Sequence, residues 1–508
     1  MKSQTKSKLK KALAIVLAVI FAVGLALSVY ATVVQFAPVA IKIDASKTYQ
    51  TMQGFGASAC WTFQDLGTDE AATERTADLL YGDDGMKLEV IRYNIGAGTK
   101  EIDHGYVAPN RATESFFISE NYTSKQSFSD PDNYDINRDK YAMRVLDACL
   151  SRGNIRTVVL FANSPHYLLT ANGKGKGNKA YENNLPEENY EAFSDYMIII
   201  ADLFAGKLSQ LENPPCIYVS PVNEPQWKWG GKDVDQEGCH YDPENLAKFY
   251  DVFYKKLKQY NSTHEVEILP DFFDCGSYLP KSKYKKYISE FKKYPFYDEL
   301  TTLSFHSYGA DNGTFYRNQF ASYYKKNVQD KALFMSEYCV MKAGTSSGID
   351  MGLYSAGVMM KDLTILSAAQ WCWWIGVSCY GFEDGLLYYD NESTKYELSY
   401  TKRYSTFSQF TRYVSSGDVR IYAAAKGDPL NFNGIEMCAF MNPSGQITLV
   451  IINNRNFSRT VKLSNAYSVN KVIYTDKKHD LYEAEASDKL SVSAKSVTTV
   501  ILNPKTAS

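Results

Sequence analysis

Histidine is scarce in this chain, and its histidines form no metal-binding pattern. Six histidines occur among 508 residues, with no HExxH motif and no close pair of ligands. Structural and catalytic zinc sites are built from closely spaced His, Cys or acidic ligands. We therefore expect no catalytic metal and no other cofactor.

An excess of positive charge is also missing. The chain has 55 Lys and Arg against 57 Asp and Glu, a formal net charge of −2, so it offers no basic field to attract nucleic acid. Its nine cysteines form no CxxC pair and no dense framework, and a chain of this length does not need disulfide bonds for stability. These absences exclude a nucleic-acid-binding protein and a disulfide-rich scaffold. They leave the oligomeric state and any disulfide pairing open.

The first forty residues have the pattern of a targeting segment. A cluster of five lysines precedes an apolar stretch from Ala12 to Val34, which passes a small-residue site at Val29-Tyr30-Ala31. The stretch is longer than the usual apolar region of a signal peptide and long enough to span a bilayer. Cleavage after Ala31, which we favour, and retention as a membrane anchor both remain open. In either case the rest of the chain is exported, so we expect a secreted or cell-surface, extracellular bacterial protein.

Residues 54–404 alternate short apolar runs with amphipathic stretches. Eight runs have the length and composition of strands, and apolar residues recur at helical spacing between them. Alternating strands and helices predict a parallel sheet, and eight such units predict a closed (β/α)₈ TIM barrel of the α/β class. The expected strands are 54–58, 88–96, 156–164, 216–224, 266–272, 300–308, 332–339 and 368–374.

The pattern changes near residue 405. Short strands with period-two alternation follow, separated by turns about every eight to twelve residues, as is typical of an antiparallel β-sandwich. Residues 41–53 have the pattern of one more strand, which we expect to join this sandwich. The predicted domains are a signal peptide or anchor (1–40), a sandwich strand (41–53), a catalytic barrel (54–404) and a C-terminal sandwich (405–508).

Two of the expected barrel strands end in glutamate. VSPVNEP places Asn223 and Glu224 at the end of the fourth strand, and FMSEYC places Glu337 at the end of the seventh. Barrel enzymes build active sites at these strand ends. Hydrolysis of a glycosidic bond needs one protonated and one ionised carboxyl group. We predict Glu224 as acid/base and Glu337 as nucleophile, with their carboxyl groups about 5 Å apart. Asn223 is expected to bind the sugar 2-hydroxyl, and salt-bridged strand ends are the structural alternative.

These motifs resemble those of glycoside hydrolase family 30. The resemblance covers nearly the whole chain after the export segment, including RYSTFSQFTRYVSSGDVRI at the junction of barrel and sandwich. It implies a clan A barrel, hydrolysis with retention, no cofactor, and an oligo- or polysaccharide substrate. NRATESFF and QEGCHYDP are most similar to the endo-β-1,6-galactanase-like branch. The other matching motifs are QGFGAS, IRYNIGAG, FANSPHYLLTANG, VSPVNEPQW, LSFHSY, FMSEYC and QWCWW.

Further substrate-binding residues follow from the resemblance and from the strand ends. Arg92 matches the family arginine near the −1 subsite and is expected to hydrogen-bond the nucleophile. Trp371 and Trp373 lie two apart on the eighth strand and therefore share a face; one is expected to form the floor under the sugar, with packing inside the barrel as the alternative. His306 and Tyr308 are expected to contact the nucleophile or a sugar hydroxyl.

The remaining candidates lie in loops at the predicted cleft. Asn163 ends the third strand and is expected at the rim, while Trp61, Trp227 and Trp229 are candidate sugar platforms. The run 173–177, GKGKG, lacks the strand-to-helix context of a phosphate loop and is expected to be a mobile rim that touches substrate. Asp271 and Asp274 lie at the end of the fifth strand and are expected to cap the following turn, with a place in the cleft lining as the alternative.

The sequence therefore predicts an extracellular retaining β-glycosidase, with an endo-β-1,6-galactanase as the best match. The first alternative is an enzyme of the same fold that cleaves a different bond, namely a glucuronoxylanase, a β-1,6-glucanase or a glucosylceramidase-type enzyme. The second is a non-catalytic carbohydrate-binding barrel on the cell surface. A basic residue to bind a uronate cannot be placed from the sequence, and endo versus exo action stays open.

Overall fold

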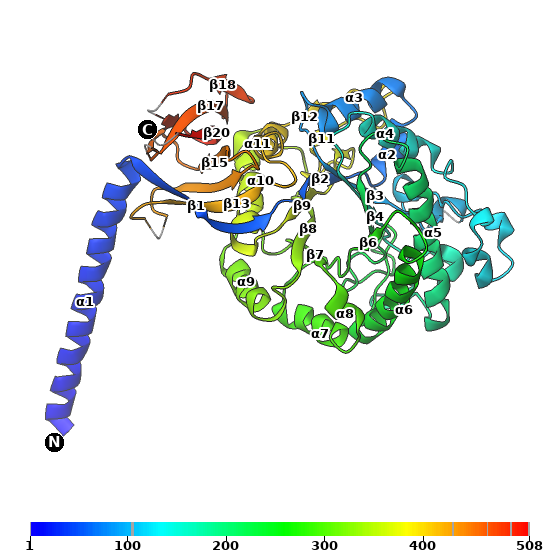
Figure 1. Cartoon of the computed structure of the whole chain (residues 1–508). Helices are drawn as coiled ribbons and strands as arrows, with labels where there is room; N and C mark the ends of the chain where they lie inside the picture. Colours follow the sequence, from blue (N-terminus) through cyan, green and yellow to red (C-terminus); the bar gives the residue numbers. More distant parts are fainter. Residues whose placement is uncertain (1, 103–105, 429–430, 465, 488–489, 506–508) are drawn as a thin grey trace.

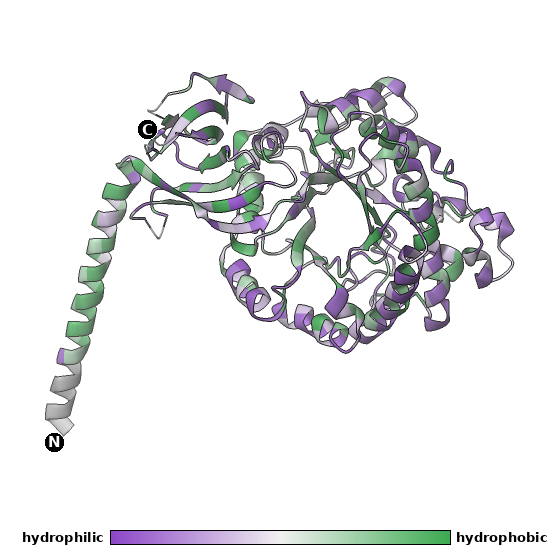
Figure 2. Cartoon of the chain, viewed as in Figure 1, coloured by the Kyte–Doolittle hydropathy of each residue, from purple (hydrophilic) through white to green (hydrophobic). Residues whose placement is uncertain are grey.

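The computed structural model describes residues 2–102, 106–428, 431–464, 466–487 and 490–505. A barrel of parallel strands surrounded by helices lies beside a β-sandwich, and a long N-terminal helix projects away from both (Figure 1). Figure 2 shows hydrophobic residues along the barrel strands and hydrophilic residues on the outward faces of the surrounding helices. The core of the larger part thus lies within and around the barrel wall, as its alternating strands and helices predict.

The barrel has the eight strands that the sequence predicts. They form one parallel sheet in the order β6-β5-β4-β3-β2-β9-β8-β7. A parallel bridge between Cys275 and Phe305 joins the segment after β6 to β7 and closes the ring. The strands are β2 (Gly54–Ser58), β3 (Val90–Asn94), β4 (Thr157–Phe161), β5 (Cys216–Ser220), β6 (Ile268–Pro270), β7 (Thr302–His306), β8 (Ala332–Tyr338) and β9 (Gln370–Trp373).

Helices surround the barrel, and most of their buried side chains are apolar. Short strands β10 (Val377–Ser378), β11 (Leu387–Tyr388) and β12 (Ser399–Tyr400) form a small sheet after β9. The helices are α2 (Thr62–Leu66), α3 (Glu70–Tyr81), α4 (Lys140–Leu150), α5 (Tyr190–Leu208), α6 (Pro243–Asn261), α7 (Lys281–Phe291), α8 (Phe296–Glu299), α9 (Phe315–Asn327) and α10 (Ile349–Lys361).

The sandwich combines both ends of the chain, as the sequence predicts. Strand β1 (Val39–Thr51) pairs antiparallel with β13 (Val419–Ala425), with Ile43 opposite Ala423. Helix α11 (Lys402–Thr411) contacts both α10 and the sandwich, so the change of pattern near residue 405 falls inside a helix. The other strands are β14 (Ile435–Met441), β15 (Ile447–Asn453), β16 (Arg459–Lys462), β17 (Tyr467–Thr475), β18 (Tyr482–Ala484), β19 (Leu490–Val492) and β20 (Ser496–Pro504).

The N-terminal helix α1 (Lys2–Phe36) is long and apolar enough to cross a membrane. Within its 26-residue segment Lys11–Phe36, the most apolar 18-residue stretch has a mean hydropathy of 2.9, and none of that stretch is buried. Its last turn meets the sandwich, where the ring of Phe36 stacks on that of Phe457 with centroids 5.4 Å apart. A helix of this kind near an N-terminus is compatible with a signal peptide.

Candidate active site

A cleft of about 510 Å³ opens at the C-terminal ends of the barrel strands and contains both predicted glutamates. Loops after several strands contribute to its wall, which is rich in aromatic side chains. Such a surface suits a sugar, because the rings cover its C–H faces and the polar groups meet its hydroxyls. The cleft is lined by Trp61, Arg111, Asn163, Asn223, Glu224, Trp227, Trp229, Asp235, Gln236, Tyr308, Glu337, Met341, Trp374, Tyr380, Phe382 and Asp384.

Glu224 and Glu337 face one another although they lie 113 positions apart in the sequence. One oxygen of each carboxyl group and a ring nitrogen of His306 all lie within 4.8 Å of one another. Retaining glycosidases hold their two carboxyl groups about 5 Å apart, and inverting ones leave about 6.5–9.5 Å for a water molecule. The observed separation therefore fits retention.

The backbone of Glu224 is held in an unusual conformation. Its φ is 50°, in the left-handed region that costs energy for a residue with a side chain. Its N–H donates to the carbonyl of Asp274 over 2.7 Å, and its own carbonyl accepts from the indole Nε1 of Trp229 over 2.8 Å. These bonds on both sides fix the conformation and aim the carboxyl group into the cleft.

Arg92 lies beneath the two glutamates and links three side chains. It is 1% exposed, and it donates from Nη1 to Glu337 Oε2 over 2.7 Å and from Nη2 to Asn223 Oδ1 over 2.8 Å. Nη2 also donates to Asp274 Oδ2. Burial lowers the pKa of Arg92, but the charges of Asp274 and Glu337 raise it further, so the guanidinium stays charged. The expected contact between Arg92 and Glu337 is present in the structure.

His306 is the second buried cation of the site. Its Nδ1 lies 3.0 Å from Glu224 Oε1 and 3.7 Å from Glu337 Oε1, and its Nε2 lies 2.9 Å from Asp274 Oδ1. Burial alone would lower the pKa of His306, but the charges of Glu337 and Asp274 raise it to about 10. The ring is therefore an imidazolium at neutral pH and donates from both nitrogens. Because it is fully buried, His306 positions the carboxyl groups and does not reach a sugar hydroxyl.

Glu224, His306 and Glu337 each offer one ligand atom, and these atoms lie close enough together to hold a metal ion. Both nitrogens of His306 already lie within hydrogen-bond distance of carboxylates. The same arrangement is better explained by an ion network, in which burial raises the pKa of Glu337 while the charges of His306 and Arg92 oppose that rise.

Asp274 joins the two cations, and the sequence did not reveal this role. Its side chain is fully buried and accepts from Arg92, His306 and the hydroxyl of Ser336. Burial raises the pKa of Asp274, but the charges of Arg92 and His306 hold it below its usual value. The expectation that Asp271 and Asp274 cap a turn was wrong. Asp271 is also buried, and burial and the charge of Asp274 raise its pKa to about 7.

Polar side chains extend the network along the cleft floor. Asn223 Nδ2 donates to Asn163 Oδ1 over 3.0 Å, and Asn163 Nδ2 donates to Asn94 Oδ1 over 3.1 Å. Tyr308 donates from its hydroxyl to Glu337 Oε1 over 3.1 Å. Asn163, Asn223 and Tyr308 all line the cleft, as their strand-end positions suggested. One of the two N–H groups of Asn223 stays available for a sugar hydroxyl.

The tryptophans of β9 are arranged differently from the prediction. Trp371 and Trp373 are both fully buried, and their indole nitrogens donate to Asp362 Oδ2 and to the carbonyl of Asp384. Both pack against Phe407 of α11, outside the barrel. Cys372 is the inward-facing residue of β9 and packs with side chains of the barrel interior. Trp374 lies two residues later and therefore points to the same side. Trp374 therefore lines the cleft in place of Trp371 or Trp373.

Trp61, Trp227 and Trp229 all reach the cleft, as predicted for sugar platforms. Trp61 packs edge-on against Trp374 and Tyr380, with ring centroids 5.1 and 5.8 Å away. Gly276 leaves space for Trp227 and Glu224, because a Cβ at this position would overlap the indole of Trp227 and the carboxyl group of Glu224. Sequence reasoning missed Gly276, Trp374 and Arg111.

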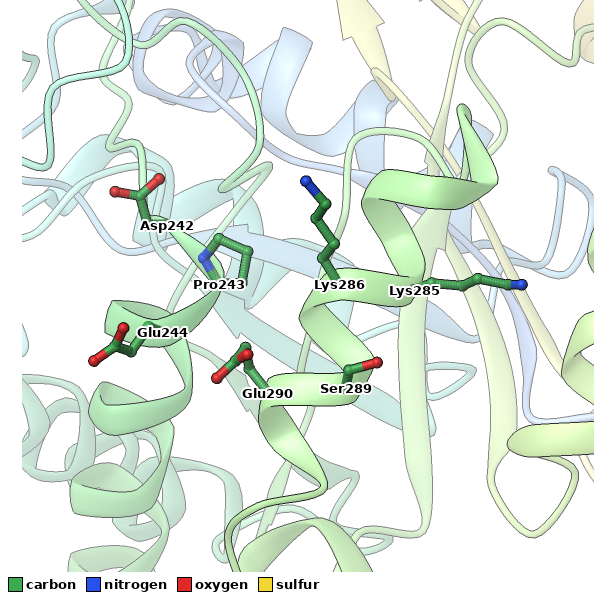
Figure 3. Close-up of a pocket in the computed structure, with 7 residues that line it drawn as sticks. All are labelled: Asp242, Pro243, Glu244, Lys285, Lys286, Ser289 and Glu290. Atoms are coloured by element: carbon green, nitrogen blue, oxygen red, sulfur yellow. The ribbon is translucent and has the colours of Figure 1, made fainter.

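A second hollow lies on the outer surface of the barrel, between the start of α6 and α7 (Figure 3). It contains no aromatic side chain and mixes lysines with carboxylates, and the figure shows several of these pointing away from one another into solvent. It therefore lacks the features of a sugar site. Its lining residues are Asp242, Pro243, Glu244, Lys285, Lys286, Ser289 and Glu290.

Known proteins resemble this chain in both sequence and fold. An endo-beta-1,6-galactanase of Hypocrea rufa is 24% identical over 407 residues, which cover 77% of this chain and 78% of that protein. A conserved exported protein from Bacteroides fragilis superposes with a TM-score of 0.76 at 22% identity. The match covers 91% of this chain and 100% of that protein. The catalytic domain of GH30 xylanase C from Talaromyces cellulolyticus superposes with a TM-score of 0.70 at 18% identity, covering 91% of this chain and 100% of that one.

Family signatures cover both parts of the fold. Residues 417–500 match the glycosyl hydrolase family 30 beta sandwich domain. Residues 38–388, well over half of the chain, match O-glycosyl hydrolase family 30, whose members are retaining glycosidases. Together with the paired carboxyl groups in an aromatic cleft, this match shows that the chain belongs to O-glycosyl hydrolase family 30 and is a retaining glycosidase.

Proposed function

We propose that this glycosidase cleaves β-1,6-linked galactan within the chain, by double displacement, with Glu337 as nucleophile and Glu224 as acid/base. The observation that carries the mechanism is the pair of carboxyl groups with oxygens within 4.8 Å, inside a cleft walled by aromatic rings. The choice of substrate is supported by the endo-beta-1,6-galactanase relative, which covers 77% of the chain.

In the first step, a Glu337 carboxylate oxygen attacks the anomeric carbon and a glycosyl–enzyme ester forms. The bond from that carbon to the leaving oxygen breaks, and Glu224 gives its proton to this oxygen. The charges around the two glutamates suit their different roles. The positive charges of Arg92 and His306 lower the pKa of Glu337 against the rise that burial causes, which favours the ionised form that the nucleophile needs.

The position of the acid proton follows from His306. Its Nδ1–H donates to Glu224 Oε1 over 3.0 Å, so Oε1 acts as an acceptor. The proton for the leaving group is therefore placed on Oε2, the other oxygen of Glu224. In the second step, Glu224 takes a proton from water, the water oxygen attacks the anomeric carbon, and the ester to Glu337 breaks with net retention.

Hydrolysis of defined glycans tests this proposal. We expect purified protein to release oligosaccharides from β-1,6-galactan, and to act less on β-1,6-glucan, glucuronoxylan and aryl β-glycosides. Endo action predicts early release of a ladder of products, whereas exo action would give one small sugar from the start. Preference for glucan or xylan over galactan would refute the proposed substrate and leave the retaining mechanism intact.

We further propose that the enzyme acts outside the cell, after export directed by residues 1–40. The apolar helix α1 near the N-terminus supports export. Cleavage after Ala31 stays a prediction. Mass spectrometry of the N-terminus of protein recovered from medium and from membranes tests it: a chain beginning at Thr32 in the medium supports cleavage, and an intact helix in the membrane fraction supports an anchor.

A further inference from the structure

Aromatic rings gather on the sandwich at the turn between β17 and β18. Tyr474 and Tyr482 lie opposite one another on these antiparallel strands, with ring centroids 5.4 Å apart. The ring of His479, in the turn, lies 5.2 Å from that of Tyr474 and 5.1 Å from that of Tyr482. Tyr482 is 51% exposed and the His479 side chain 38% exposed. These three residues, which we call the sandwich cluster, therefore offer ring surface to solvent.

A fourth ring belongs to Tyr400 on the short strand β12. It stacks on the ring of Tyr404 in α11, with centroids 4.6 Å apart and planes inclined by 28°. Tyr400 is nevertheless 48% exposed, so the stack covers one side of its ring and leaves the rest open. Tyr404 is buried, and its hydroxyl donates to the carbonyl of Leu79 over 2.9 Å, which fixes the stack. An exposed ring that is already fixed loses little entropy when a ligand binds to it.

The start of α11 links the sandwich cluster to the catalytic cleft. Arg403 donates to Glu383 over 2.6 Å, and the next residue, Asp384, lines the cleft. Lys402, beside Arg403, donates to the carbonyl of His479 over 2.9 Å. Helix α11 also contacts β17 (Figure 1). Because α11 follows the last barrel strand, it begins at the end of the barrel where the strands end. The sandwich cluster therefore lies toward the same end of the barrel as the cleft.

The charges around the sandwich cluster largely cancel. Three basic side chains each lie within 3.0 Å of a carboxylate, in the pairs Lys402–Asp480, Lys471–Glu483 and His479–Asp476. Lys477 and Lys478 in the turn are exposed, where water and salt screen their charges. The surface thus combines apolar ring faces with polar ring edges. It suits the C–H faces and hydroxyls of a neutral sugar better than it suits an anionic partner.

From this geometry we propose that the sandwich cluster and Tyr400 form a second, non-catalytic binding site for a neutral β-linked glycan chain that also occupies the catalytic cleft. The inference rests on the proposed function, because the expected ligand is the β-1,6-galactan that the enzyme cleaves. Binding at two places on one chain raises the effective concentration of the polymer at the cleft. The gain requires a chain long enough to reach both places, so it is absent for short oligosaccharides.

Hydrolysis of a long and a short substrate tests this site. The variant combines Tyr400→Ala with Tyr482→Ala, which are both exposed, so the fold should be preserved. We expect KM for β-1,6-galactan to rise about five- to tenfold, because two ring contacts are lost. KM for β-1,6-galactotriose and kcat on both substrates should stay unchanged, because the site does not touch the reacting sugar. An unchanged KM for the polymer, or an equal rise for the trisaccharide, overturns the proposal.

Tyr49→Ala is the matched control. Tyr49 is 45% exposed on β1 of the same sandwich. The next residue, Gln50, donates to the carbonyls of Leu363 and Ala368, which precede β9. Tyr49 therefore lies toward the end of the barrel where the strands begin, away from the cleft. Its replacement should leave KM for the polymer at the native value, and a rise equal to that of the double variant would contradict a site at the sandwich cluster.

Affinity electrophoresis of the inactive variant Glu337→Gln measures polymer binding without turnover. In gels that contain β-1,6-galactan, adding Tyr400→Ala and Tyr482→Ala should weaken the retardation about fivefold, to a similar extent at low and high salt. Salt-dependent retardation would indicate an anionic partner, and tyrosine-dependent self-association in sedimentation runs would indicate a second copy of the chain; either result overturns the proposal.

Failure of the proposed function can be told apart from failure of this site. If β-1,6-galactan is not hydrolysed, the proposed function fails. The same variants are then run in gels of the glycan that the enzyme does cleave, from the panel of β-1,6-glucan and glucuronoxylan. Retardation that depends on Tyr400 and Tyr482 supports the second site, and retardation that does not depend on them overturns it.

Discussion

Replacing Arg92 by methionine should separate the electrostatic role of this residue from its packing. Methionine has a similar length and no charge, so the variant leaves Asp274 and Glu337 buried without their guanidinium partner. Arg92 lies 2.7 Å from Glu337 and also pairs with Asp274, and none of the three side chains is more than 7% exposed. Loss of one partner from a buried ion pair costs about 3–5 kcal/mol. We expect a decrease of that size in the free energy of unfolding at pH 7.

The size of this loss should depend on pH. In the native protein Arg92 and His306 hold the folded pKa of Asp274 below the unfolded one, near 3.9. This contribution to stability is present above that unfolded value and lost as the pH falls through the lowered folded pKa. In the variant, burial dominates and the folded pKa rises above the unfolded one. The deficit relative to the native protein should therefore grow as the pH rises from about 4 to 7.

Urea denaturation followed by tryptophan fluorescence at several pH values measures this deficit. Arg317→Met is the matched control, because Arg317 forms an ion pair with Asp362 that is fully buried and lies outside the cleft. Both variants should lose stability, but only Arg92→Met should lose about 10²-fold or more in kcat/KM, because it removes a charge that keeps Glu337 ionised. A variant at Arg92 with native stability, or with a deficit independent of pH, would refute this reasoning.

Five further substitutions probe the proposed roles. Glu337→Gln should abolish turnover and keep the native melting temperature. Glu224→Gln should spare only substrates with acidic leaving groups, and equal loss on aryl glycosides and glycan would contradict its acid role. His306→Phe removes a positive charge near Glu337, so the pKa of Glu337 should rise and the acidic limb of the kcat/KM profile should move to higher pH; an unchanged limb would count against the network. Trp374→Ala should raise KM about tenfold by loss of ring contact, whereas Trp371→Ala should cost about 3–5 kcal/mol of stability without that change in KM.

The barrel and its glutamates could be predicted because their signals are local. Each strand is a short apolar run, and the strand ends of a closed parallel barrel must meet at one face. Glu224 and Glu337 end two such runs, so their proximity follows from the topology alone. The same reasoning correctly brought Arg92, Asn223 and Tyr308 to this face, because each lies at or near the end of its run.

The face of a tryptophan on β9 could not be predicted in this way. In QWCWW, Trp at positions 371 and 373 and Cys at 372 suit either side of a barrel wall, since both sides are apolar. The pairing of β8 with β9 also shifts register between Met335 and Tyr338. Asp274 was missed for a related reason: it follows β6 in an irregular segment, and its contacts depend on how the ring closes against β7.

The ion network couples catalysis to closure of the barrel. Arg92 comes from β3, Asp274 from the segment after β6, His306 from β7 and Glu337 from β8, and no two neighbouring strands contain the whole set. A buried charge without its partners is costly, so each of these residues destabilises a barrel that is not fully closed. Only the complete ring balances two cations against two carboxylates. The ion network that positions Glu337 beside Glu224 is therefore the same one that makes the closed barrel stable.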